Sequence, residues 1–159
     1  MKRACTMLAM AFCLACQTEK TQAPIMKTDL QELSKLIQFP AAPVSAKWIL
    51  SSPTTAGRIG PNDFTIVALL EFSAEGMQQV RAKSNAAPDA EPVALRDPEL
   101  PLFFTAAEAV GWERPSHGFV VVPGTTFGPA AFAKAPYMQG KVVIVDGRPN
   151  LVLVTLYTT

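Results

Sequence analysis

Cysteine, histidine and charge are scarce in this chain, and each scarcity excludes a class of chemistry. Its 159 residues include three cysteines, all before position 17, and one histidine, His117. Zinc sites of the usual kind need several His or Cys ligands. We find no P-loop, G-x-S-x-G, G-x-G-x-x-G or D-x-D-x-D-G motif. We therefore expect no metal and no cofactor, although an oxygen-ligand site stays open.

Charge of either sign is also sparse. Charged residues make up 17% of the chain, and the formal net charge is +1. Nucleic-acid binding requires clustered Lys and Arg that neutralise several phosphates. We therefore predict no nucleic-acid partner. The hydrophobic fraction of 49% is that of a globular chain with a real core.

Long apolar runs are missing after the first 15 residues. The uncharged stretch 4–15 follows Lys2 and Arg3, and it has the dimensions of a secretory signal. It is shorter than the ~20 residues that span a bilayer as a helix. Further along, FTIVALLEF is interrupted by Glu71. We therefore expect an export signal rather than a transmembrane helix.

The stretch Leu14-Ala15-Cys16 followed by Gln17 resembles the lipobox of bacterial lipoproteins. It departs from the usual pattern in one place, because Cys13 stands three positions before Cys16, where leucine is usual. The resemblance implies cleavage before Cys16 and fatty acylation of that residue. It also implies delivery to the outer membrane of a Gram-negative cell, facing the periplasm, because Gln17 rather than Asp follows. An ordinary cleaved signal and an uncleaved apolar N-terminus are the alternatives.

Cys13 and Cys16 also form a C-x-x-C spacing, which is a redox motif in other settings. Here the pair lies in an apolar leader, and cleavage would leave one acylated cysteine. A disulfide or thiol nucleophile in the folded domain would then be impossible. Loss of residues 1–15 would remove two of the fourteen basic residues and none of the thirteen acidic ones. The mature chain would be nearly neutral and would contact the membrane through its lipid alone.

The sequence predicts three parts: a signal peptide (1–15), a lipidated Cys16 with a tether (16–27), and one globular domain (28–159). Helical periodicity favours a helix over 28–39, capped by Thr28 or Asp29, and another over 73–83. A capping box, Thr105 to Glu108, predicts a third short helix. The stretch 84–102 has four prolines and reads as a long ordered loop, which is often functional.

Strand patterns occur at 44–50, 64–72, 118–124, 141–145 and 151–157. Trp48 is expected on a buried face. Asp146-Gly147 between the last two runs predicts a hairpin. Together these elements predict an α+β fold with a mainly antiparallel sheet of about five strands and two or three short helices packed on it. A βαβ arrangement over 64–122 is the alternative. The stretch GPNDFTIVALLEF resembles small uncharacterised bacterial envelope proteins, which adds no activity.

Candidate binding residues lie in two polar loops. Trp112, Arg114 and His117 form the richest polar-aromatic cluster, and loops often hold binding residues. The alternative for Trp112 is a plug at the edge of the core. Arg58 and Asp63 bracket Gly60-Pro61, where turn stabilisation is the alternative to ligand contact.

Three functions fit these observations. The first is a lipid-anchored, non-catalytic envelope protein with a protein-binding domain; one specific version is the immunity type that neutralises a periplasmic toxin. The second is a small periplasmic hydrolase using His117 with a distant Ser and Asp; loss of activity in His117→Ala would test it. The third is a structural component that contacts peptidoglycan or an outer-membrane complex.

Overall fold

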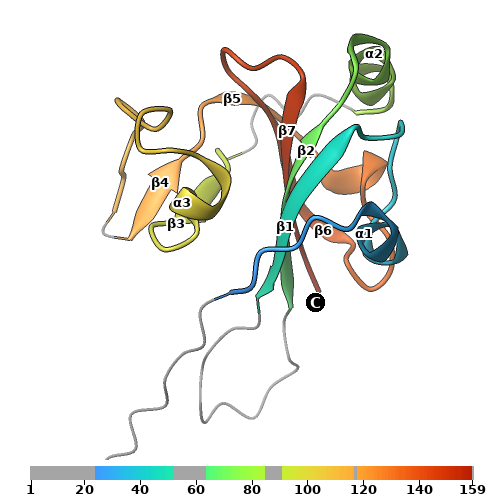
Figure 1. Ribbon diagram of the computed structural model, residues 1–159, viewed down its shortest axis with the longest axis horizontal. Coiled ribbons are helices and arrows are strands. Elements are labelled where there is room, and N and C mark those ends of the chain that lie inside the picture. Colours follow the sequence, from blue (N-terminus) through green and yellow to red (C-terminus); the bar gives the residue numbers. More distant parts are fainter. Residues whose placement is uncertain (1–23, 52–63, 85–90, 117, 159) are drawn as a thin grey trace, which may run out of the picture.

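A five-stranded antiparallel sheet forms the centre of the computed structural model, which describes residues 24–51, 64–84, 91–116 and 118–158 (Figure 1). Its strand order is β1-β2-β7-β6-β5. The bounds are Ser45–Ser51 for β1, Thr65–Glu71 for β2, Gly124–Phe127 for β5, Gln139–Val145 for β6 and Leu151–Tyr157 for β7. The predicted α+β fold with a mainly antiparallel sheet is confirmed.

Smaller elements surround this sheet. β3 (Ala94–Arg96) and β4 (Phe119–Val121) pair in a second, two-stranded sheet. The helices are α1 (Leu30–Leu36), α2 (Ala74–Lys83), α3 (Leu100–Phe103) and the 3₁₀ turn η1 (Pro129–Ala131). In the part of the chain that the structure describes, no helix combines the length and the apolarity needed to cross a membrane.

The two longer helices begin where side-chain oxygens cap them. The Asp29 carboxylate accepts hydrogen bonds from the backbone N–H groups of Gln31 (2.7 Å) and Glu32 (2.9 Å). Ser73 Oγ accepts one from the N–H of Gly76 at 3.1 Å. Such caps satisfy backbone donors that have no partner inside a helix. Of the two predicted caps for the first helix, Asp29 is the one used.

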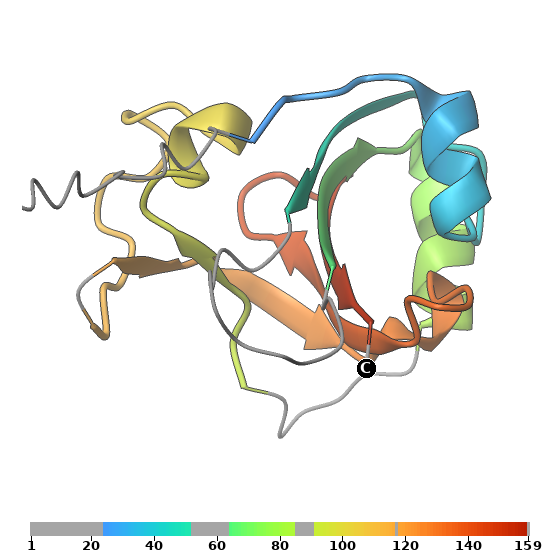
Figure 2. The ribbon, with the colours of Figure 1, turned by 90° about the horizontal axis from the view of Figure 1, so that it is seen from below.

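Different elements cover the two faces of the large sheet, as Figure 2 shows. On the helical face, Trp48, Ile66 and Val154 pack with α1, α2 and η1 in one core cluster. On the β3–β4 face, Ile49, Val67 and Leu153 pack with the second sheet and α3. Because β2 is covered on both sides, its sequence TIVALLE is apolar almost throughout. Trp48 is fully buried, as predicted.

The C-terminal hairpin forms as predicted. β6 and β7 pair antiparallel, with Val142 opposite Val154. Gly147 adopts a positive φ of 70°, which favours glycine, in the turn that joins them. The N–H of Arg148 donates to the carbonyl of Val145 at 3.1 Å and closes this turn.

Other local predictions were wrong. The βαβ alternative fails because both neighbours of β2 run antiparallel to it, and β3 belongs to the other sheet. The stretch 84–102, expected to be a loop, contains β3 and most of α3. The strand expected at 118–124 is divided between β4 and the start of β5. These short elements depend on distant partners, which periodicity does not reveal.

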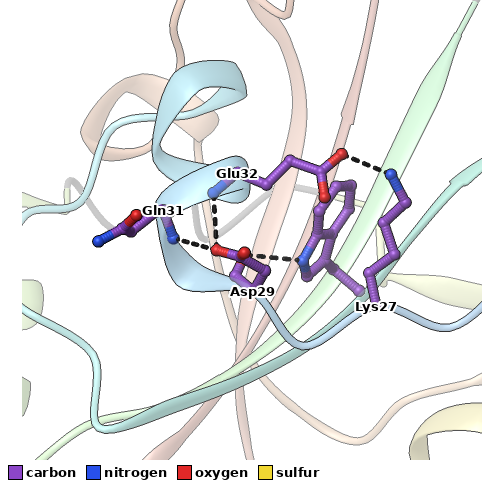
Figure 3. A network of polar contacts seen from close by, with 5 residues as sticks. Lys27, Asp29, Gln31 and Glu32 are labelled. Carbon is purple, nitrogen blue, oxygen red and sulfur yellow. Dashed lines mark hydrogen bonds and ion pairs between the residues drawn. The ribbon is translucent and has the colours of Figure 1, made fainter.

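The segment before α1 is fastened to the edge of β1 (Figure 3). Lys27 and Trp48 exchange two backbone hydrogen bonds of 2.8 Å. Lys27 Nζ lies 2.5 Å from Glu32 Oε1 and 4.8 Å from the centre of the Trp48 ring. Trp48 Nε1 donates to the carbonyl of Asp29 at 3.2 Å. Lys27, which the sequence assigned to the tether, is therefore held against the domain.

Candidate functional site

A cleft of about 390 Å³ opens at one end of the large sheet, on its β3–β4 face. We call this end the cleft end; Ser45, Glu71 and Leu151 lie there, paired across β1, β2 and β7. One wall is apolar and comes from α3 and the residue after it. Four charged side chains line the rest: Lys47, Glu71, Glu108 and Arg148.

Glu71 closes the sheet side of the cleft. Its Oε2 accepts a hydrogen bond from Ser45 Oγ at 2.9 Å, and its Oε1 accepts one from Asn150 Nδ2 at 3.2 Å. Ser45 lies opposite Glu71 in the register of β1 and β2. Both carboxylate oxygens are thus occupied by donors from neighbouring segments.

Glu108 is held more tightly on the opposite side. Its Oε2 accepts hydrogen bonds from the backbone N–H of Thr105 at 2.6 Å and from Thr105 Oγ1 at 2.8 Å. Its Oε1 pairs with the guanidinium of Arg148 from the β6–β7 turn. The Thr105 hydrogen bonds and the positive charge of Arg148 hold the pKa of Glu108 below its ordinary value. Glu108 is therefore an ionised acceptor at neutral pH.

The contacts of Thr105 and Glu108 are those of the predicted capping box, but residues 106–111 form turns rather than a helix. The capping box therefore helps to form the wall of the cleft. One oxygen of Glu108 closes the turn, and the other binds Arg148. The prediction of a helix beginning there was wrong, because the side-chain pattern specifies the first turn only.

Among the charged residues that line the cleft, Lys47 is the one for which neither an ion pair nor a side-chain hydrogen bond is found in the described part of the chain. It lies on β1 between the buried Ala46 and Trp48, so that its side chain stands on the β3–β4 face. Within the described ranges, no ion pair or side-chain hydrogen bond engages its ammonium group. The cleft therefore offers one available cation beside an apolar wall.

This arrangement suits binding better than proton transfer. A general acid must carry a proton near neutral pH, and the lowered pKa of Glu108 opposes that. Glu71 and Glu108 both accept hydrogen bonds from the chain itself. Within the described residues, no group of three or more His, Cys, Asp or Glu side chains could hold a metal ion.

The structure places two of the predicted binding residues. Trp112 packs half-buried at the edge of the β3–β4 face, edge-on to Phe104 with ring centres 4.9 Å apart. Arg114 pairs with Asp97 at 2.5 Å on the surface. Phe104 lines the cleft, so Trp112 supports its wall from behind, whereas neither Trp112 nor Arg114 lines the cleft itself. Their role in binding stays a prediction.

The other predicted site residues, Cys16, Arg58, Asp63 and His117, lie outside the described residues. Sequence reasoning missed Lys47, Glu71 and Arg148 as members of one site. The available signals were an acidic residue that ends an apolar strand and a basic residue in a hairpin turn. Neither signal says that the two segments meet.

Comparison of the chain with protein-family models, with curated proteins and with solved structures gave no match.

Proposed function

We propose that this chain is a lipid-anchored protein of the bacterial cell envelope whose folded domain binds another protein. The N-terminal pattern supports the anchor: Lys2 and Arg3, an uncharged stretch, and Leu14-Ala15-Cys16. The observation that carries the binding role is the cleft, where two carboxylates are occupied and Lys47 is available. The proposed location is the outer membrane, with the domain in the periplasm.

The surroundings of the cleft favour a protein over a small solute. Val44 and Val110 are 65% and 78% exposed, and each lies within two residues of a cleft-lining position. Lys47 stands on β1, which is an edge strand. We propose that a partner that reaches Lys47 also contacts these two valines; the outer edge of β1 beside Trp48 is already paired with Lys27. We propose that the partner places an apolar side chain against the α3 wall and a carboxylate beside Lys47.

The first experiment tests the anchor. In Cys16→Ser cells, we expect incorporation of labelled fatty acid into the protein to be abolished and the domain to leave the membrane fraction, because the acceptor sulfur is gone. Cys13→Ser is the matched control and keeps both properties. Labelling that persists in Cys16→Ser, or that requires Cys13, contradicts the proposed anchor.

The second experiment tests the cleft. The full chain, purified from membranes, is used to recover partners from envelope extract. We expect Lys47→Glu to reduce recovery of the partner at least tenfold, because its charge would then repel the partner's carboxylate and that of Glu71. Lys35→Glu, on the exposed side of α1, is the matched control and leaves recovery unchanged. Recovery of no partner, or equal recovery by both variants, contradicts the proposal.

A further inference from the structure

Exposed apolar side chains gather at the end of the sheet opposite the cleft. Ser51, Thr65 and Tyr157 are paired across β1, β2 and β7 at this end, which we call the Tyr157 end. Leu50 and Tyr157 are 37% and 40% exposed there. Met138, directly before the start of β6, is 56% exposed. Within the described part of the chain, large apolar side chains at this end are therefore exposed to solvent.

The chain enters the domain at this same end. The bridge between Lys27 and Trp48 is antiparallel, so the chain followed backward from Lys27 runs along β1 toward Ser51. Figure 1 shows this segment passing the lower end of β1. Ile25, two residues before the bridge, is 71% exposed. The ion pair of Lys27 with Glu32 and its contact with the Trp48 ring hold Lys27 in place at the bridge.

The length of the connection to Cys16 limits where the domain can stand. Residues 17–23 separate Cys16 from Pro24. Eight residue steps reach at most about 29 Å when fully extended. A seven-residue strand is itself about 23 Å long. A lipid on Cys16 therefore keeps the Tyr157 end near the bilayer, whereas the cleft end could reach the bilayer only with the connection drawn out.

The chemistry of the two ends agrees with this limit. Aliphatic, thioether and phenol side chains are favourable at the water–lipid boundary. Lys141, near the Tyr157 end, is neutralised by Glu91 at 2.9 Å. The cleft end instead holds ionised groups whose burial in lipid would be costly. Tethering also raises the local concentration of the membrane surface, so that weak contacts are sufficient to orient the domain.

We propose that the Tyr157 end of the sheet, with Ile25, Leu50, Met138 and Tyr157, rests on the surface of the anchoring bilayer, and that the cleft faces away from it. This inference depends on the proposed lipidation of Cys16. The membrane-facing end would leave the cleft accessible to a soluble periplasmic partner.

Single-thiol variants of the lipidated full chain can test this orientation, because Cys16 would be acylated and no cysteine follows it. Met138→Cys and Leu50→Cys report on the Tyr157 end, and Val44→Cys and Val110→Cys are exposed controls at the cleft end. Each is labelled with bimane and reconstituted in phosphatidylethanolamine–phosphatidylglycerol vesicles containing nitroxide-labelled lipid. We expect quenching at least threefold stronger at the Tyr157 end.

The outcomes separate the two proposals. Mass spectrometry first establishes whether Cys16 carries lipid; a chain without it contradicts the proposed function and this orientation together. A lipidated chain quenched equally at both ends, or more at Val44 and Val110, overturns the orientation alone. A dimer in detergent, found by sedimentation, that shields the Met138 label would assign this end to a second copy and also overturn the orientation. Circular dichroism checks that each variant is folded.

Discussion

The two faces of the large sheet are covered in different ways. On the helical face, α1 and α2 carry capped first turns and pack onto buried side chains such as Trp48. On the β3–β4 face, the covering elements are three or four residues long. The Arg96–Glu99 pair joins β3 to the start of α3, and the Arg148–Glu108 pair joins the turn 106–111 to the β6–β7 turn. The cleft belongs to this second face.

From this difference we expect the β3–β4 face to change its shape more readily than the helical face. Binding surfaces are often drawn from parts of a protein with few regular elements and lower local stability. Short elements held by side-chain contacts can adjust to a partner, whereas the helical face supplies a fixed support. Substitutions on each face test this contrast.

Truncation of a tryptophan on each face should give the largest difference in stability between the two faces. Trp48 is fully buried, and its indole N–H donates to Asp29. We expect Trp48→Ala to lower the free energy of unfolding by roughly 3–5 kcal/mol. Trp112 is only half-buried, so Trp112→Ala should cost about 1–2 kcal/mol. Urea denaturation measures both, and equal losses would contradict the contrast between the faces.

The buried carboxylate of Glu99 should give the next largest effect. It accepts hydrogen bonds from the backbone N–H of Arg96 at 3.1 Å and from Arg96 Nε at 2.8 Å, and it is 5% exposed. We expect Glu99→Gln to lower the free energy of unfolding by about 1–3 kcal/mol, because the buried carboxylate that accepts from Arg96 loses its charge. Asp97→Asn, which removes the exposed pair with Arg114, should cost less than about 1 kcal/mol. A reversed order would show that the surface pair holds this face.

The smallest expected effect is the loss of the stability contributed by Glu108 at acid pH. The lowered pKa of Glu108 means that its ionised form stabilises the fold. That contribution is complete above the unfolded-state pKa, near 4.5 for Glu, and is lost as the pH falls through the lower folded-state pKa. We expect Glu108→Gln to be less stable than the parent protein at pH 7 and equal to it at the acid limit. Glu113→Gln, at an exposed position, is the matched control.

Thermal melting across pH would provide this measurement. The difference in melting temperature between Glu108→Gln and the parent protein could instead stay constant down to the acid limit. That result would mean that the Thr105 and Arg148 contacts contribute no proton-linked stability.

Sequence reasoning succeeded where one segment carries its own signal. Asp29 and Ser73 cap the helices that follow them, and TIVALLE is apolar between its two end residues because β2 is covered on both faces. It failed at 84–102, where prolines suggested a loop. β3 there is a strand only because β4, more than 20 residues later, pairs with it.

The division at 118–124 has a similar cause. At Gly124 a Cβ atom would lie 2.1 Å from the carbonyl oxygen of Ile144. Only glycine therefore fits where β5 approaches β6 this closely. The run FVVVPG looks continuous in sequence, yet its first half pairs with β3 and its end joins the large sheet.

Caps, turns and periodicity are local signals, so they are enough to predict the α+β class, the capped helices, the C-terminal hairpin and the residues that form the buried strands. The tertiary structure is needed to show that Lys47, Glu71, Glu108 and Arg148 line one cleft. These residues come from β1, β2, a turn and a hairpin, and their proximity depends on strand order and register. It also decided that the chain enters at the end of the sheet opposite that cleft, because one bridge between Lys27 and Trp48 sets the direction.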